Sequence, residues 1–324
     1  MKKSSFFILS SVFAFSILPT LSYADYQVKK DGTLVEDKYI ATGTVQEHYS
    51  LMMKAVEQQN WVETAKQSRI IVENFPETPF AQESLYQLGV SQYYMEEFDQ
   101  ADKWLSSYLK NKLQTHLKYF EEAMQYKFEI AEQFRAGAKR RMFHAEKLPK
   151  WLSAESDAIQ IYDEVIQVLP GHELAAKSLF AKGTLLAEID RYSESVKAFE
   201  TLIERFPRHD LTSEAYVAIA AVYAKQLKKE KDHPDLFSLA QLNYNKFRKN
   251  FPKEDRLTKV ENYLKEMQET FAQGLYEIGA FYERKKQPHA ATVYYKNVIT
   301  DYPSSQVAQL CQERLQALQA VNNK

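Results

Sequence analysis

Apolar residues recur at intervals of three and four through most of the chain, which is the pattern of amphipathic helices. Several of these segments end at a proline that follows an apolar residue. The five dipeptides are Phe75-Pro76, Leu169-Pro170, Phe206-Pro207, Phe251-Pro252 and Tyr302-Pro303. Because proline lacks a backbone N–H and clashes with the preceding turn, each dipeptide predicts the end of one helix and the start of a turn.

Small residues stand at fixed distances before these helix ends. Twelve residues before the five prolines are Thr64, Ala158, Ser195, Ala240 and Ala291, and Ala101 opens a sixth segment of this kind without a proline. A second small residue lies further upstream in four segments, at Gly89, Gly183, Ala220 and Gly279. Two antiparallel helices approach closely only where side chains are small, so these positions predict repeated contacts within helix pairs.

The spacing of small, aromatic, aliphatic and proline positions is that of the tetratricopeptide repeat, a helix–turn–helix unit of about 34 residues. We therefore predict an all-α, right-handed solenoid of about six helix pairs plus a C-terminal cap helix. An irregular helical bundle could match the spacing of one repeat unit by chance, but a chance match of five units with the same spacing is not expected. The predicted pairs span 45–74, 79–110, 113–169, 172–206, 211–251 and 257–302, and the cap spans 304–320.

The chain divides into three predicted parts. Residues 1–24 have a positive head, a short apolar run and a small-residue end, which is typical of a secretory signal peptide. Residues 25–44 are polar and without helical period, so we expect an extended lead-in. Residues 45–324 form the repeat solenoid, with an insertion around 113–152.

The net charge and the placement of reactive residues exclude several classes of function. A formal net charge of −1 over 324 residues argues against nucleic-acid binding. The seven histidines form no helical metal pair, and no nucleophile stands beside a base, so we expect neither an enzyme nor a metal, cofactor or small-molecule site. Glycines at 274 and 279 have the spacing of a phosphate loop but lack its lysine. The lone Cys311 lies in an apolar stretch and is expected to be buried.

A basic stretch runs from Arg135 to Lys150, with six positive side chains against Glu146. It has two interpretations. The residues touch anionic lipid headgroups or an acidic partner, or they keep an exposed loop soluble.

The first helix of each repeat normally lines the concave face. Tyrosines there suit extended peptides, because large amphipathic rings give contact area at low entropy cost. The candidate peptide groove is Tyr86, Val90, Tyr93, Tyr94, Phe180 and Thr184. Alternatively, several of these side chains fill space between helices.

The stretch from 232 to 306, with its long helix ending at Arg284 and the Tyr302-Pro303 turn, resembles the C-terminal half of the BamD family. Residues 60–81 are similar to that family's first repeat. The family implies a periplasmic protein of the outer-membrane β-barrel assembly machinery, which binds the barrel-forming subunit and unfolded barrel proteins. Carried over by position, the candidate partner-docking residues are Tyr276, Tyr282, Glu283, Arg284 and Lys285.

One departure from the family changes the expected membrane attachment. BamD-like proteins are typically lipoproteins, but this sequence has no lipobox cysteine at the end of its leader. We expect an exported protein that is peripheral to the outer membrane through its partners.

Three functions compete on the sequence alone. The first is a non-enzymatic scaffold in outer-membrane protein assembly. The second is a periplasmic adaptor for cell division or peptidoglycan synthesis, of the Tol-associated type. The third, an exported enzyme with a helical toroid fold, has no constellation of residues to support it.

Overall fold

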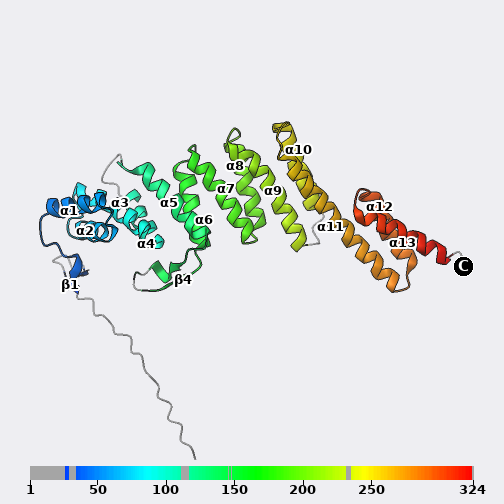
Figure 1. The fold of residues 1–324 in the computed structure, drawn as a ribbon, viewed down its shortest axis with the longest axis horizontal. Helices are drawn as coiled ribbons and strands as arrows, with labels where there is room; N and C mark the ends of the chain where they lie inside the picture. The colour runs from blue at the N-terminus through cyan, green and yellow to red at the C-terminus, as the bar shows by residue number, and fades with distance from the viewer. Residues whose placement is uncertain are drawn as a thin grey trace, which may run out of the picture. The chain divides into compact units, whose positions relative to one another are not determined.

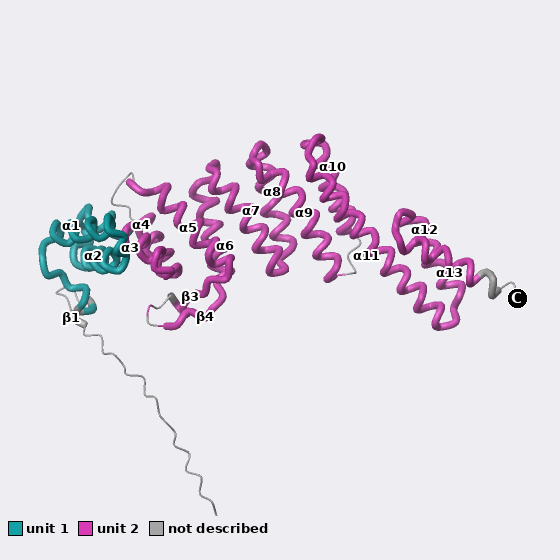
Figure 2. The backbone as a smooth tube through the Cα atoms, viewed as in Figure 1, with its two compact units in different colours: residues 1–85 teal, residues 86–324 magenta. Residues whose placement is uncertain are grey.

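The computed structural model describes residues 26–28, 34–110, 117–144, 146, 148–230 and 235–322. These residues form thirteen α-helices and four short strands (Figure 1), which confirms the all-α repeat fold. The predicted signal peptide lies outside the described residues. Two compact units, 1–85 and 86–324, divide the chain (Figure 2).

The first unit holds one complete helix pair. Helix α1 (Val45–Glu57) packs against α2 (Trp61–Asn74), and the first half of α3 (Pro79–Tyr94) follows. Thr44 caps α1 in a capping box with Glu47. The lead-in is more ordered than predicted, since β1 (Tyr26–Val28) pairs antiparallel with β2 (Leu34–Glu36) before a 3-10 turn at Asp37–Tyr39.

The second unit continues the alternation of helices along the chain. After the second half of α3 come α4 (Phe98–Lys110), α5 (Phe120–Arg135), α6 (Glu155–Val168), α7 (Glu173–Glu188), α8 (Tyr192–Arg205), α9 (Asp210–Lys229), α10 (Asp235–Asn250), α11 (Leu257–Arg284), α12 (Pro288–Asp301) and α13 (Gln306–Asn322). From α4 onward each helix packs on the next, and α11 also contacts α9 and α13. The 28-residue length of α11 agrees with the sequence prediction.

The region predicted as an insertion is divided by the structure. Helix α5 begins at Phe120 rather than at Leu113, because residues 118–119 form a turn; residues 113–116 lie outside the described residues. Helix α5 packs on α6 and so belongs to the third pair. The inserted element is the connection between them, which contains β3 (Arg140–Arg141), a 3-10 turn (Met142–His144) and β4 (Lys150–Leu152).

Small residues occupy the closest contacts between paired helices. A Cβ atom added to Gly183 would lie 2.7 Å from the ring of Phe199, and one added to Gly89 would lie 2.6 Å from Leu105. The Ser195 hydroxyl donates to the Gly183 carbonyl oxygen over 2.7 Å. The alanines at the other predicted contact positions are fully buried, namely Ala101, Ala158, Ala220, Ala240 and Ala291.

The turns inside the pairs share one geometry. The second residue after the helix end has a positive φ in five pairs, at Gln59, Glu96, Gly137, Asp190 and Lys286. The next residue donates its N–H to a carbonyl five residues back, as from Gln287 to Tyr282 (3.0 Å). This Schellman motif reverses the chain in few residues, which holds the second helix antiparallel to the first.

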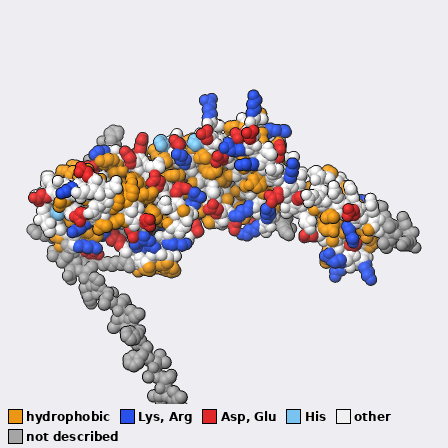
Figure 3. All heavy atoms as spheres, in the orientation of Figure 1, with side chains coloured by type: hydrophobic (Ala, Val, Ile, Leu, Met, Phe, Trp, Pro, Cys, Tyr) orange, Lys and Arg blue, Asp and Glu red, His pale blue; other side chains and the backbone are white. Residues whose placement is uncertain are grey.

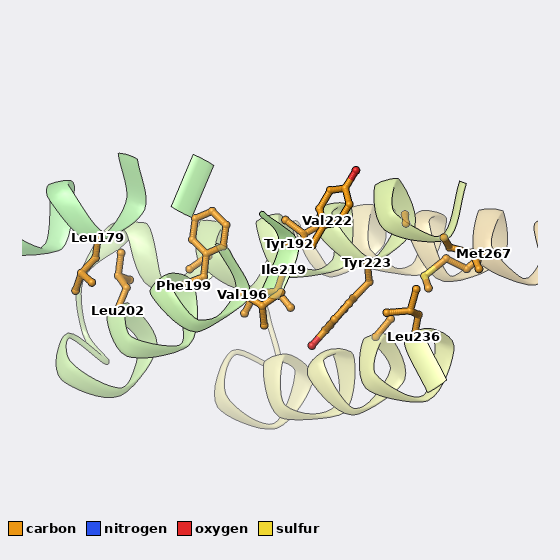
Figure 4. Packing of buried hydrophobic residues seen from close by; sticks show 14 residues of the cluster. Leu179, Tyr192, Val196, Phe199, Leu202, Ile219, Val222, Tyr223, Leu236 and Met267 are labelled. Carbon is orange, nitrogen blue, oxygen red and sulfur yellow. The ribbon is translucent and has the colours of Figure 1, made fainter. Parts of the chain in front are cut away.

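The core runs through successive helices rather than around one centre. Its largest described cluster joins α7 to α11 and includes Phe199, Leu202, Ile219 and Met267 (Figure 4). A second cluster joins α11, α12 and α13 around Tyr295 and Cys311. Each hairpin therefore buries its apolar face on its neighbours, as expected of a repeat array.

A buried lysine ties three helices together. Lys127 on α5 is 1% exposed and lies 2.8 Å from Asp102 on α4 and 2.6 Å from Glu164 on α6. Burial alone would lower its pKa, but the two carboxylates outweigh burial and raise it. Lysines are common in amphipathic helices, so the sequence did not predict that Lys127 would pair with carboxylates of two neighbouring helices.

Candidate functional site

The tyrosine-rich face lies on α3, α5 and α7. A cavity of about 540 Å³ opens there, and its lining is mainly aromatic and acidic. The lining residues are Tyr86, Tyr94, Glu121, Glu122, Gln125, Tyr126, Glu129, His172 and Leu174. Aromatic rings with several carboxylates suit an extended polypeptide that carries aromatic and basic side chains.

Tyr86, Tyr94 and Tyr126 line this cavity, and Tyr93 packs against Tyr94 and Tyr126. Tyr86 is 8% exposed and stacks on Tyr119 with ring centres 4.4 Å apart. The Tyr94 hydroxyl is 3.3 Å from that of Tyr126, and Tyr94 is 49% exposed. Burial, together with a hydrogen bond to Glu129, raises the pKa of Tyr93 to about 12. Burial also raises the pKa of Tyr86 and Tyr126, so the hydroxyls of these two cavity tyrosines stay protonated near neutral pH and can donate hydrogen bonds.

The structure separates the six predicted groove residues. Tyr94 and Tyr86 line the cavity, with Tyr94 exposed and Tyr86 buried, whereas Tyr93 and the buried Val90 are outside the lining. Phe180 packs on Phe199 with ring centres 5.4 Å apart, and the Thr184 hydroxyl donates to the Phe180 carbonyl. Val90, Phe180 and Thr184 are thus packing residues outside the cavity lining. The sequence analysis left out Tyr126 and the carboxylates of α5, because the residues that complete the cavity with them lie on α3 and α7.

The five predicted docking residues lie toward the end of α11. Three of them make contacts inside the chain and two face solvent. Tyr276 packs on Tyr295, and Tyr282 stacks on Tyr294 with ring centres 5.5 Å apart. Glu283 accepts a hydrogen bond from the Tyr295 hydroxyl (2.9 Å) and pairs with Arg314 of α13.

The other two docking residues face solvent. Arg284 and Lys285 are exposed, and the Lys285 ammonium lies 5.7 Å from the ring centre of Phe281, which is 47% exposed. Of the five, only these two offer unburied charges, while Tyr276, Tyr282 and Glu283 hold α11 to α12 and α13.

A larger groove lies beside this end and was not predicted. It encloses about 750 Å³ along α11 and α13, where Gly274 leaves open space. Ile278 and Leu310 expose apolar side chains into it, and Glu269 and Glu277 line it. The sequence analysis considered Gly274 only as part of an incomplete phosphate loop. A glycine inside the long helix α11 was the feature that could have indicated this groove.

The basic segment from Arg135 to Lys150 is held by internal ion pairs. Arg135 pairs with Glu132 (2.6 Å), Arg140 with Asp157 (2.7 Å) and Arg141 with Asp99 (2.8 Å). The interpretation as a loop that is merely solvated by its charges is therefore wrong for these side chains. Arg140 and Arg141 fasten the α5–α6 connection to α6 and α4, and the pair of Arg135 lies within α5.

The described residues contain neither a metal-binding cluster nor a membrane-spanning helix. Within them, no group of three or more His, Cys, Asp or Glu side chains is arranged to hold a metal ion. No helix among the described residues has the length and apolar character needed to cross a bilayer.

Comparison with protein families gives one match. Residues 187–324, less than half of the chain, match the family described as "YfiO: Outer membrane lipoprotein". This is the BamD lipoprotein family, so the resemblance stated from the sequence is confirmed over the C-terminal repeats. The similarity of residues 60–81 to the family's first repeat lies outside the match and stays a prediction. A search of curated proteins found no match.

Solved structures that match this chain have low sequence identity, and two of the three below are described as tetratricopeptide-repeat proteins. YrrB, described as a TPR protein with an unusual peptide-binding site, is 11% identical, with a TM-score of 0.38 over 68% of this chain and 92% of its own. A tetratricopeptide repeat protein from Parabacteroides merdae is 11% identical, with a TM-score of 0.37 over 85% and 98%. Apo RapI is 13% identical, with a TM-score of 0.39 over 84% and 76%.

Proposed function

We propose that this chain is a non-enzymatic scaffold in the assembly of outer-membrane β-barrel proteins, acting in the periplasm beside the outer membrane. The observation that carries the proposal is the match of residues 187–324 to an outer-membrane lipoprotein family. Stacked helical hairpins support it, since repeat arrays present long surfaces to other polypeptides.

The end of α11 is the surface proposed to dock the barrel-assembly subunit. Arg284 and Lys285 project into solvent there, beside the exposed ring of Phe281. Internal contacts of Tyr282 and Glu283 fix the helix end that carries them. A rigid, positively charged corner suits a partner surface with carboxylates, because complementary charges raise the association rate and fix the register.

The cavity on α3, α5 and α7 is the proposed site for unfolded barrel proteins. Its tyrosines offer flat apolar contact with hydroxyl groups at the ring edge, and Glu121, Glu122 and Glu129 favour basic side chains. An extended, aromatic-rich segment therefore fits this lining better than a compact anionic ligand does.

The proposal is tested by affinity purification from chemically crosslinked cell envelopes. Three forms of the full chain are compared: wild type, Arg284→Glu and the control Lys249→Glu. Lys249 is an exposed lysine near the end of α10, so the control matches the charge change away from the proposed surface. We expect the barrel-assembly subunit with wild type and control, and about tenfold less with Arg284→Glu.

Two results would contradict the proposal. One is recovery of cell-division or peptidoglycan-synthesis proteins without any barrel-assembly subunit. The other is equal recovery of that subunit with Arg284→Glu and wild type, which would remove the assigned docking surface.

A further inference from the structure

The connection between α5 and α6 exposes three large apolar side chains in one short segment. Phe143 is 84% exposed, Trp151 is 59% exposed and Leu148 is 40% exposed. Figure 3 shows hydrophobic side chains at the lower edge of the molecule, where Figure 1 places β4. Single exposed apolar residues are ordinary, but a cluster at the end of a loop marks an interaction site.

Folding gives no reason for an aromatic residue at position 143. Its backbone has a φ of 54°, a left-handed conformation that bulky residues adopt at a cost and glycine adopts freely. The Phe143 ring is almost wholly in solvent, so burial does not offset this cost. The residue is therefore explained better by contact with something outside the chain.

Ion pairs hold the base of this segment rigidly. Arg141 lies 2.8 Å from Asp99, whose side chain is fully buried, and 2.5 Å from Glu97. Lys150 lies 3.1 Å from Glu97 and donates to the Glu96 carbonyl oxygen over 2.8 Å. Both strands of the hairpin are thus tied to the start of α4 and the turn before it.

The charge of the segment indicates what the tip contacts. Residues 139–152 carry five basic side chains and one acidic side chain, and three of the basic ones, Arg140, Arg141 and Lys150, pair with carboxylates outside the segment. Aromatic residues next to lysines and arginines are the usual composition of a polypeptide at a membrane interface, where rings enter the headgroup region and cations meet phosphates.

We propose that this hairpin is a membrane-interface anchor, with Phe143 and Trp151 entering the headgroup layer of a bilayer that contains anionic lipid. The inference rests on the envelope location given under the proposed function, but not on the assembly role.

The test is co-sedimentation with vesicles of phosphatidylethanolamine and phosphatidylglycerol. The protein is purified after export and its N-terminus is determined, so that all variants share the same first residue. The variant Phe143→Ser/Trp151→Ser is compared with the control Leu242→Ser/Val293→Ser, which removes two apolar side chains of similar exposure elsewhere (51% and 56%). Because all four residues are exposed, both variants should unfold at the wild-type temperature.

We expect wild type and control to bind these vesicles, and the hairpin variant to bind about tenfold more weakly. Wild-type binding should also fall when phosphatidylglycerol is replaced by phosphatidylcholine. Failure of wild type to sediment, or equal binding of the hairpin variant, would overturn the proposal. So would a photo-crosslinker at position 151 that captures a protein instead of lipid in cells.

The vesicle assay contains no protein partner. Vesicle binding without recovery of the barrel-assembly subunit from envelopes would therefore sustain the anchor and remove the assembly role. The opposite pair of results would remove only the anchor.

Discussion

Missing side chains determine how closely the paired helices approach one another. At Gly279 a Cβ atom would lie 2.6 Å from the ring of Tyr295, which is fully buried and hydrogen-bonded to Glu283. Since that ring is held on both sides, it cannot move aside for a methyl group. The same helix contains Gly274, where a Cβ atom would meet nothing within 4 Å.

These two glycines give a matched test of the contact. We expect Gly279→Ala to destabilise the fold by about 1–3 kcal/mol through overpacking. Gly274→Ala should stabilise it by about 0.5–1 kcal/mol, because alanine favours a helix interior over glycine. Urea unfolding followed by circular dichroism measures both, and equal shifts in the midpoint would contradict the packing account.

Cys311 provides a test that depends on pH. Burial raises the pKa of its thiol from 9.0 to about 11. Only the thiolate reacts with iodoacetamide, so the folded protein should be alkylated far more slowly at pH 8 than the protein in urea. Equal alkylation rates with and without urea would show that the thiol is accessible.

The same shift predicts how stability changes in alkaline solution. Between pH 9 and 11 the unfolded chain loses the thiol proton while the folded chain keeps it. The contribution of Cys311 is therefore complete below pH 9 and declines as the pH rises through this window. A Cys311→Ala variant should lack this part of the alkaline decline in urea midpoint.

The position of a single residue in the fold was predictable where the size of its side chain limits the positions it can occupy. Glycine and alanine at fixed spacing could be assigned to helix contacts because only small residues fit there. The contacts of charged and aromatic side chains were harder to predict from the sequence, since their partners lie on other helices. Nothing in the sequence around Glu283 reveals Arg314, and Arg141 is separated from Asp99 by more than 40 residues. Such residues look like surface charges until the fold brings their partners together.

At the scale of the helices, the turn inside each pair is a recurring element. Gln59, Glu96, Asp190 and Lys286 adopt a left-handed conformation without being glycine. Each satisfies the end of the first helix through the same backbone hydrogen bonds. The conformation costs an ordinary residue about 1 kcal/mol, which the packing of two helices outweighs.

We therefore expect Lys286→Gly to stabilise the protein by about 0.5–1 kcal/mol, because glycine adopts positive φ without that cost. Lys285→Gly is the control, since Lys285 has a φ of −81° and gains nothing from glycine. Thermal unfolding distinguishes them. If Lys286→Gly lowers the midpoint as much as Lys285→Gly, the left-handed turn does not carry the predicted cost.

Helix ends marked by proline were predictable, because proline acts through local geometry. The start of α5 was not, since the turn at 118–119 contains neither glycine nor proline. Tyr126, Glu122 and Glu129 were left out of the predicted groove for another reason, since the residues that complete the cavity with them lie on α3 and α7. The short strands of the lead-in and of the α5–α6 connection were missed because three-residue strands have too few positions to show alternation.

At the scale of the whole molecule, the repeats separate two proposed tasks along the chain. The tyrosine cavity belongs to α3, α5 and α7, and the proposed docking corner belongs to α11. Repeat arrays allow this separation because each hairpin is held mainly by its neighbours. The all-α repeat fold followed from periodicity alone, whereas the assembly role draws on the family match of residues 187–324.

The most direct test of that role is depletion of the protein in the bacterium that encodes it, followed by measurement of folded β-barrel proteins in the outer membrane. Heat-modifiable migration on gels reports the folded fraction. The account predicts that folded barrel proteins decline as the chain is depleted, before growth stops. Normal barrel levels together with defective septation would contradict it and favour an adaptor for cell division.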